Sequence, residues 1–253
     1  MNGKNDSGDA RPGSIALITG GARRLGAAMA RTLADHGWDI VIHHRSSAKE
    51  AESLAEELRG LGRRAWTIEA DLSSPGECKE LVPRAVELAG SLSALVNNAS
   101  IFPCSHFTNF EAQAVHDNVQ LHAIAPALLA REFAKLASAR HVLNMLDSKI
   151  TGPDDEHFAY HLSKQLLASL TSIMARELAP QIAVNALAPG AMLPAAGVAD
   201  QKFADLANTV PMKKTGTPAD IASAAVFLLG SQFITGQVLF VDGGRHLEGQ
   251  IYG

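Results

Sequence analysis

The chain has 253 residues and a formal net charge of −4, and 47% of its residues are hydrophobic. This length suits one α/β domain with a full core, and the charge excludes the strongly basic surface typical of proteins that bind nucleic acid or anionic membranes. The two cysteines are too few for a disulfide framework, and neither they nor the ten histidines show metal-ligand spacing, so we expect no metal.

The first twelve residues are polar and glycine-rich, unlike the apolar core of a signal peptide. No apolar run approaches the length of a transmembrane helix. We therefore expect a loose tail at residues 1–12, one domain at residues 13–253, and a cytoplasmic protein that contacts neither membrane nor nucleic acid.

Apolar strands and amphipathic helices alternate along the chain. Strands are predicted near Ser14–Thr19, Asp39–His43, Ala65–Glu69, Ala94–Asn97, His141–Leu146, Ala183–Ala188 and Gln237–Val241. Helices are predicted near Arg24–His36, Ala48–Arg59, Pro75–Ala89, within Phe110–Ala137, and near Phe158–Leu178 and Pro218–Leu229. Buried strands joined by crossover helices predict a doubly wound parallel sheet with helices on both faces, in a single domain.

A glycine-rich turn follows the first predicted strand, where such sheets bind their ligands. It reads Thr19-Gly20-Gly21-Ala22-Arg23-Arg24-Leu25-Gly26 and leads into a helix. Glycines at this place let backbone N–H groups approach a pyrophosphate at the helix N-terminus, which predicts a dinucleotide site. The alternative is that they only allow tight packing of strand against helix.

Tyr160 and Lys164 are spaced to lie one above the other on a helix face. There the ammonium is expected to stabilise the tyrosinate and to lower the pKa of the phenol toward working pH. A phenol tuned in this way delivers a proton while another group delivers a hydride. Asp147 precedes the tyrosine by thirteen positions.

In this order and spacing, the motifs between Ile15 and Gly244 resemble those of the short-chain dehydrogenase/reductase family. The motifs are the TGxxxxxG turn, Asn97-Asn98-Ala99, Tyr160-x-x-x-Lys164, Pro189-Gly190 and Val241-Asp242-Gly243-Gly244. The resemblance implies a Rossmann-type fold, a bound nicotinamide dinucleotide and a homotetramer. It also implies cofactor contacts by Gly20, Leu25, Gly26, Asp71, Leu72, Asn98, Ala99, Ser100, Tyr160, Lys164, Pro189 and Gly190.

Two departures resemble the pteridine reductase branch of that family. Arg24 stands where most members have glycine, and Asp147 stands where most have serine. The strings His43–Ser46 and Asn98–Phe102 are similar to that branch, and the ending Leu239–Leu247 is similar to bacterial dihydromonapterin reductases.

The stretch after the second strand predicts the cofactor. NAD enzymes of this fold usually place an acid there to bind the ribose 2′-OH, whereas an arginine accommodates a 2′-phosphate. This chain has His44-Arg45-Ser46 and no acid until Glu50, and Arg23 or Arg24 could add a second cation. These residues favour NADPH.

Asp147 limits the class of substrate that the site would accept. An ionised carboxylate only accepts hydrogen bonds, so it would repel a ketone oxygen and suit the N–H donors of a pterin's amino-pyrimidine edge. Hydride would reach a ring C=N carbon, and the resemblance implies that Tyr160 or a water supplies the proton while Lys164 holds the nicotinamide ribose. Arg24, Ser100 and Phe102 are the other candidates for substrate contact, although Phe102 could equally be a core residue. The expected substrate is dihydromonapterin, dihydrobiopterin or dihydrofolate.

Two other functions stay open. The first is a carbonyl reductase of the same fold in which Ser148, with Tyr160 and Lys164, acts on a ketone. The second is a non-catalytic NADPH-binding sensor, because His122 stands where the family commonly has an asparagine. The resemblance implies that the backbone of this asparagine helps to relay protons to the lysine, a role that His122 could keep or Asn118 could partly take. The segment 191–209 is expected to form a substrate lid. The helix that carries Tyr160 is apolar on more than one face, so one side is expected to meet the sheet and the other a partner subunit. The alternative for the second side is burial beneath another helix of the same chain.

Overall fold

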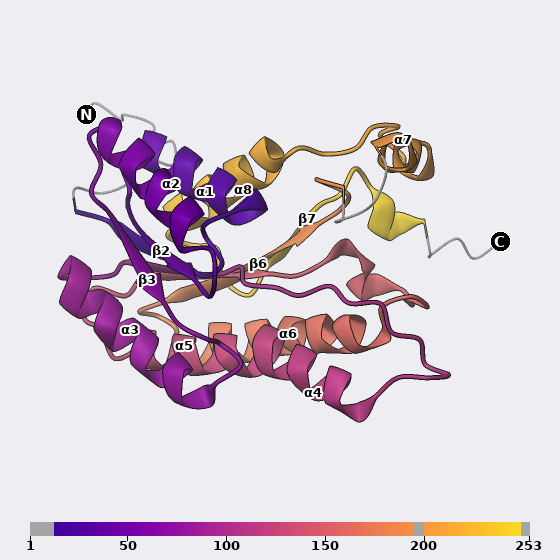
Figure 1. The fold of residues 1–253 in the computed structure, drawn as a ribbon, viewed down its shortest axis with the longest axis horizontal. Helices are drawn as coiled ribbons and strands as arrows, with labels where there is room; N and C mark the ends of the chain where they lie inside the picture. Colours follow the sequence, from indigo (N-terminus) through magenta and orange to yellow (C-terminus); the bar gives the residue numbers. More distant parts are fainter. Residues whose placement is uncertain (1–12, 195–199, 249–253) are drawn as a thin grey trace.

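A parallel sheet of seven strands forms the centre of the computed structural model, which describes residues 13–194 and 200–248 (Figure 1). The strands are β1 (Ile15–Ile18), β2 (Asp39–His44), β3 (Ala65–Glu69), β4 (Ala94–Asn97), β5 (His141–Met145), β6 (Ala183–Pro189) and β7 (Val238–Val241). Their order is β3-β2-β1-β4-β5-β6-β7, so the chain changes direction across the sheet between β1 and β4. Ligands of such sheets bind at this switch point, outside the carboxyl ends of the strands. The predicted tail at residues 1–12 lies outside the described residues.

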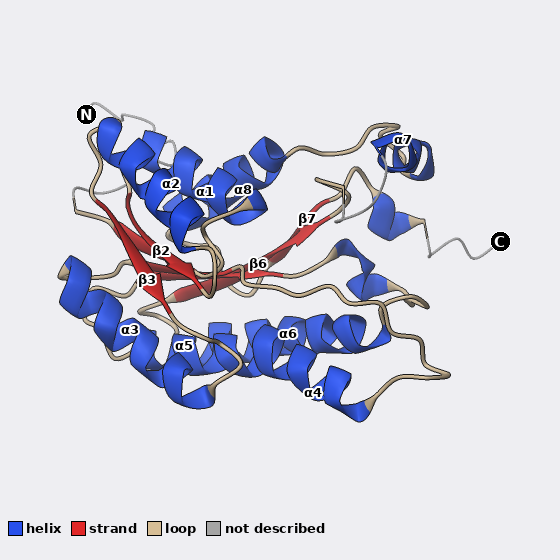
Figure 2. Cartoon of the chain, in the orientation of Figure 1, coloured by secondary structure: helices blue, strands red, loops and turns tan. Residues whose placement is uncertain are grey.

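Helices cover both faces of the sheet (Figure 2). One face carries α1 (Arg24–Asp35), α2 (Ala48–Gly60) and α8 (Pro218–Gly230), and the other carries α3 (Pro75–Ala89), α4 (Ala112–Val119), α5 (Ala125–Phe133) and α6 (Phe158–Glu177). Successive residues of β1 face opposite sides, with Ala16 and Ile18 in the first core and Ile15 and Leu17 in the second. Because both faces are buried, β1 is apolar throughout, which is typical of a parallel sheet.

The long helix predicted within residues 110–137 is interrupted. A π-helical turn, Gln120–Ile124, separates α4 from α5. In a regular α-helix the carbonyl of His122 would accept from the N–H of residue 126, but Pro126 has none. The missing donor accounts for the irregular turn, and such π turns are frequent at functional sites.

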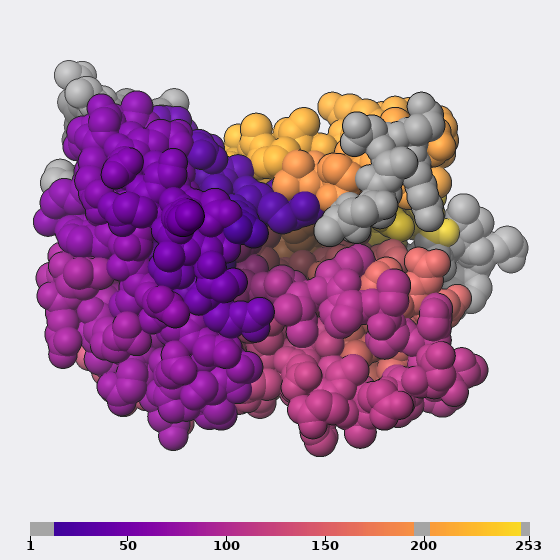
Figure 3. All heavy atoms as spheres, viewed as in Figure 1, coloured from indigo at the N-terminus to yellow at the C-terminus, as the bar shows by residue number. Residues whose placement is uncertain are grey.

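Short elements complete the described chain: the 3-10 turns Ser148–Thr151, Leu206–Thr209 and Arg245–Leu247, and helix α7 (Asp200–Asp205). The expected lid contains α7 and the second of these turns, while its residues 195–199 lie outside the described part. The surface is hollowed between the magenta segment after β4 and the orange segment before α8 (Figure 3). None of the helices in the described ranges is long and apolar enough to cross a bilayer.

Candidate active site

The glycine turn after β1 is shaped as an anion cradle. Gly20 has a φ of +59°, and a Cβ placed on Gly26 would lie 2.4 Å from the carbonyl oxygen of Gly20. The start of α1 has no side-chain cap within the described chain and no acidic residue in its first turn. Its N–H groups therefore point at the crevice without a negative side chain to satisfy them, which suits a pyrophosphate.

Two buried or half-buried side chains, those of Asn98 and Thr19, connect this turn to the loop after β4. The amide of Asn98 donates to the carbonyl oxygens of Thr19 (2.9 Å) and Gly20 (3.1 Å). The hydroxyl of Thr19 accepts from the backbone N–H of Asn98 (2.8 Å) and of Ala99 (3.0 Å). The loop after β4 therefore holds the glycine turn in place.

His43 supports the turn from the other side and was not among the residues predicted for the site. Gly20 N–H donates to its Nδ1 (3.1 Å), so the proton lies on Nε2, which donates to the carbonyl of Ala70 (3.0 Å). Burial lowers the pKa of His43 to about 4, so the ring is neutral and keeps this tautomer. Strand position alone gave no sign of this role.

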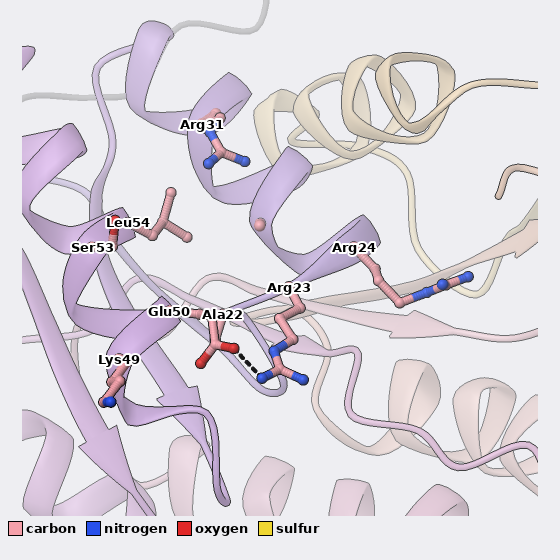
Figure 4. A pocket seen from close by; sticks show the side chains of 9 residues that line it. Ala22, Arg23, Arg24, Arg31, Lys49, Glu50, Ser53 and Leu54 are labelled. Carbon is pink, nitrogen blue, oxygen red and sulfur yellow. Dashed lines mark hydrogen bonds and ion pairs between the residues drawn. The ribbon is translucent and has the colours of Figure 1, made fainter. Parts of the chain in front are cut away.

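The predicted 2′-phosphate residues lie at the end of β2. Arg45 and Ser46 are exposed, whereas His44 is buried and its Nδ1 has no hydrogen-bond partner among the described residues. Beside them, a groove of about 570 Å³ between α1 and α2 is lined by Arg23, Arg24, Arg31, Lys49 and Glu50, with Ala22, Ala27, Ser53 and Leu54 (Figure 4). Arg23 pairs there with Glu50, while Arg24 extends away from the groove.

The trio Asp147, Tyr160 and Lys164 meets at the carboxyl end of β5. The phenol of Tyr160 donates to Oδ2 of Asp147 (3.1 Å), whose Oδ1 accepts from the N–H of Lys149 (2.8 Å). Lys164, fully buried, donates from Nζ to the carbonyl of Met145 (2.6 Å). Ser148 is also buried, but its Oγ has no partner among the described residues. The side chain that reaches the tyrosine is therefore Asp147 and not Ser148.

The pKa of Tyr160 is shifted in the direction opposite to the one expected. Burial, followed by the charge of Asp147, raises it well above its usual value, and so the phenol keeps its proton. Burial also lowers the pKa of Lys164 to about 8, against the opposing effect of Asp147. The Lys164 ammonium donates to the Met145 carbonyl and lies 5.5 Å from the centre of the tyrosine ring, and the effects of burial and of Asp147 determine the direction of the Tyr160 pKa shift.

Phe102 forms an aromatic wall beside the phenol. Its ring is 46% exposed, meets Tyr160 edge-on at 4.7 Å between ring centroids, and stacks on His157 at 3.8 Å. His157 is oriented by Asp154, whose Oδ1 accepts from ring Nδ1 at 3.3 Å. Half exposure rules out the core reading of Phe102, and the supporting pair His157 and Asp154 was missed because it follows β5, far from Phe102 in sequence.

Arg24 occupies a strained backbone conformation at the mouth of the site. Its φ of +53° lies in the left-handed region that favours glycine, the residue most family members have here. Its guanidinium donates to the carbonyl of Pro194 (2.9 Å), at the start of the expected lid. Strain of this kind persists where the surrounding structure holds it, often at functional sites.

The remaining predicted residues lie along the same edge. Asp71 accepts from the N–H of Ser73 (2.9 Å), which is the main reason its pKa is lowered, and Leu72 beside it is buried. Pro189 ends β6, and a Cβ on Gly190 would lie 2.7 Å from Asp242. Ser100 is exposed in the loop after β4.

His122 lies inside the site, whereas Asn118 does not replace it. The His122 ring meets Tyr160 edge-on, with ring centroids 5.3 Å apart. The Asn118 amide donates to the carbonyl of Ala114 within its own helix (2.8 Å). In the described part of the chain, no three histidine, cysteine or acidic residues gather as a metal site would require.

Comparison with known proteins gives concordant results. A family model described as enoyl-(acyl carrier protein) reductase matches residues 20–246. An uncharacterized oxidoreductase of Mycobacterium tuberculosis is 36% identical over 91% of both chains. A 3-oxoacyl-[acyl-carrier-protein] reductase of Staphylococcus epidermidis is 27% identical over 92% of this chain and 98% of its own. The crystal structure of FolM alternative dihydrofolate reductase 1 from Brucella canis, complexed with NADP, superposes with a TM-score of 0.88 at 30% identity, covering 94% of this chain and 96% of that one.

Proposed function

The chain belongs to the short-chain dehydrogenase/reductase family, and we propose that it is an NADPH-dependent reductase of dihydropterins that forms the tetrahydropterin. The observation that carries this proposal is the carboxylate of Asp147 on the hydroxyl of Tyr160, where a ketone reductase needs a neutral hydroxyl donor. The similarity to a Brucella dihydrofolate reductase supports the same substrate class.

The residues present fit NADPH. The pyrophosphate would lie on the turn Gly20–Gly26, where an added Cβ at Gly26 would close the cradle. The 2′-phosphate would be met by Arg45 and Ser46, and by His44, whose buried Nδ1 lacks a partner in the described chain. Arg23 would join them by leaving Glu50. The solved Brucella relative contains NADP, and when bound here the cofactor would supply the hydride.

The pterin would lie between the nicotinamide and the wall formed by Phe102. Its flat ring suits stacking on a half-exposed aromatic side chain. Asp147 would accept from the N–H groups of the amino-pyrimidine edge, while Arg24 and Ser100 would line the opening.

Tyr160 would provide the proton that balances the hydride. Reduction of a C=N bond places hydride on carbon and a proton on nitrogen. Because the pKa of the phenol is raised, Tyr160 carries its proton at neutral pH and is able to give it, directly or through a water. The Lys164 ammonium would hold the ribose and stabilise the tyrosinate as it forms.

We also propose a homotetramer in which α6 meets another subunit. Leu162, Leu166 and Ile173 on this helix are exposed, with 37%, 39% and 56% of their surface accessible, whereas Leu167 and Met174 are buried on the side of the sheet. An apolar stripe of this kind suits contact with a second copy.

A ketone reductase is the second candidate, and the similarity to a 3-oxoacyl-[acyl-carrier-protein] reductase favours it. It would require Ser148 to donate to the substrate oxygen. The phenol of Tyr160 donates to Asp147 and not to Ser148, which speaks against that role.

The proposal is tested by the rate of NADPH oxidation with 7,8-dihydromonapterin and dihydrofolate, beside a 3-oxoacyl thioester. We expect turnover of a pterin, a loss of about 100-fold or more in Asp147→Ser, and no loss with the ketone. Ser148→Ala is the matched control and should leave pterin reduction unchanged. A wild-type protein that binds NADPH but reduces only the ketone would sink the proposal.

A further inference from the structure

His122 connects two parts of the site that are distant in sequence. Its imidazole is 1% exposed and lies in the π turn between α4 and α5. Nδ1 lies 2.8 Å from Oγ of Ser163 on α6. Nε2 lies 2.9 Å from Oγ of Ser100 and accepts from the N–H of Ile101 at 3.1 Å, both in the loop after β4.

The contacts fix where the proton of this ring lies. A backbone N–H only donates, so the N–H of Ile101 requires an unprotonated Nε2. The proton is therefore on Nδ1 and is donated to Ser163, whose hydroxyl in turn donates to the carbonyl of Tyr160 (2.6 Å). Burial, together with the nearby Lys164 ammonium, lowers the pKa of His122 to about 2, so the ring stays neutral.

We propose that His122 is a positioning residue whose side chain sets the loop after β4 and helix α6 relative to each other. The inference rests on the proposed NADPH-dependent reduction. Through Nε2 the ring holds Ser100 and Ile101, which follow the Asn98-Ala99 pair under the glycine turn. Through Nδ1 and Ser163 it holds the backbone of Tyr160, and its edge packs on the phenol.

The ring does not act as a proton carrier. Both nitrogens are engaged, the side chain is sealed from solvent, and protonation of Nε2 would break its bond to Ile101. The side chain also exceeds the reach of asparagine, the usual family residue. An asparagine amide can stand in for Nδ1 and contact α6, but it stops short of the β4 loop.

Two substitutions separate the two halves of this connection. His122→Asn places a donor near the Nδ1 position, so it keeps the hydrogen bond to Ser163 and loses those to Ser100 and Ile101. His122→Gln places an acceptor near the Nε2 position, so it keeps the hydrogen bonds to Ser100 and Ile101 and loses the one to Ser163. We expect His122→Asn to raise the Kd and KM for NADPH about ten-fold with kcat within about two-fold, and His122→Gln to lower kcat about ten-fold with NADPH binding preserved.

Ser163→Ala provides an independent variant in case a change at position 122 prevents folding. It removes the same bond as His122→Gln and should lower kcat by the same factor, and the double variant should be no worse than either single one. Thermal unfolding of each variant identifies a general loss of stability.

The proposal would be overturned if His122→Asn and His122→Gln changed the Kd for NADPH and kcat to the same extent. It would also be overturned if both variants lowered only the unfolding temperature. The Kd for NADPH needs no turnover, so the loop half is decided even if pterins are not reduced. Failure of wild type to reduce any pterin would refute the substrate and leave this contrast measurable with a ketone.

Discussion

The two ends of the crevice are built differently. At the end of β5, the polar groups of Asp147, Tyr160 and Lys164 are half-buried or buried and have partners within the chain. At the basic end, Arg45 after β2 is exposed, and Arg23 before α1 pairs with Glu50, which is itself exposed. The first end is organised before any ligand arrives, while we expect the second to be completed by the cofactor.

The difference decides which effects dominate at each end. Burial shifts the pKa values of Tyr160 and Lys164 and makes every unpaired group costly, so a change there should act on the reaction. Exposed ion pairs contribute only about 0–1 kcal/mol and are screened by salt, so a change at the β2 end should act on cofactor affinity.

The largest effect is expected for Tyr160→Phe. The variant keeps the ring that Phe102 and His122 pack against but cannot donate a proton, and a general acid contributes roughly 10²–10⁴-fold to rate. We therefore expect kcat for pterin reduction to fall about 1000-fold while NADPH still binds. Steady-state rates and fluorescence titration with NADPH measure the two properties.

An unchanged rate in Tyr160→Phe would point to a proton donor other than the phenol. Normal cellular function of a protein that binds NADPH without turnover would favour the sensor hypothesis instead.

The next largest effect is expected on the pH dependence of activity and stability that arises from Lys164. Its ammonium is charged below the folded pKa of about 8, so activity should decline as pH rises through that value. The folded pKa lies below the value of 10.5 expected in the unfolded chain. Between these two values the unfolded state binds more protons, and folding stability contributed by this group therefore increases with pH.

Lys164→Met removes this dependence and provides the comparison. Relative to the variant, the wild-type protein should gain on the order of 1–3 kcal/mol in unfolding free energy between about pH 7 and about pH 10. Urea unfolding at both pH values measures the gain. Equal pH profiles of stability for the two proteins would show that Lys164 titrates normally.

The sequence predicted the fold well because the signals for a parallel sheet are local. Apolar runs and glycine punctuation placed all seven strands within one residue of the observed bounds, and the candidate site residues were taken from the strand ends. The spacing of Asp147, Tyr160 and Lys164 brought them together as expected. The interrupted helix could have been anticipated from Pro126, which removes the donor for the His122 carbonyl.

Other features of the site could not be predicted because they depend on the three-dimensional surroundings. The direction of the Tyr160 pKa shift follows from burial and from a carboxylate on its hydroxyl, neither of which the Tyr-Lys spacing contains. The support of Phe102 by His157 joins segments 55 residues apart. The contacts of His122 likewise reach both α6 and the β4 loop.

At the basic end, Arg45→Ala should affect affinity rather than chemistry. Loss of a charge-assisted contact to the 2′-phosphate should raise the KM for NADPH about ten-fold and leave the KM for NADH and kcat nearly unchanged. The effect should shrink with added salt. Arg31→Ala is the matched control, because Arg31 lines the same groove but is bound to Glu57 at 2.7 and 2.8 Å. A similar loss in both variants would indicate a general effect of charge.

The smallest effect tests whether strain at Arg24 serves function. Arg24→Gly relieves a positive φ that costs a non-glycine residue about 1 kcal/mol, so the unfolding temperature should rise by about 2–4 °C. Lys213, with a φ of +52°, is the matched control, and Lys213→Gly should give a similar rise with unchanged kinetics. Only Arg24→Gly should also raise the KM for the pterin, a few-fold, because it removes the guanidinium that reaches Pro194. If the two variants behave alike in both assays, Arg24 is a strained surface residue and the mouth of the site is organised by other groups.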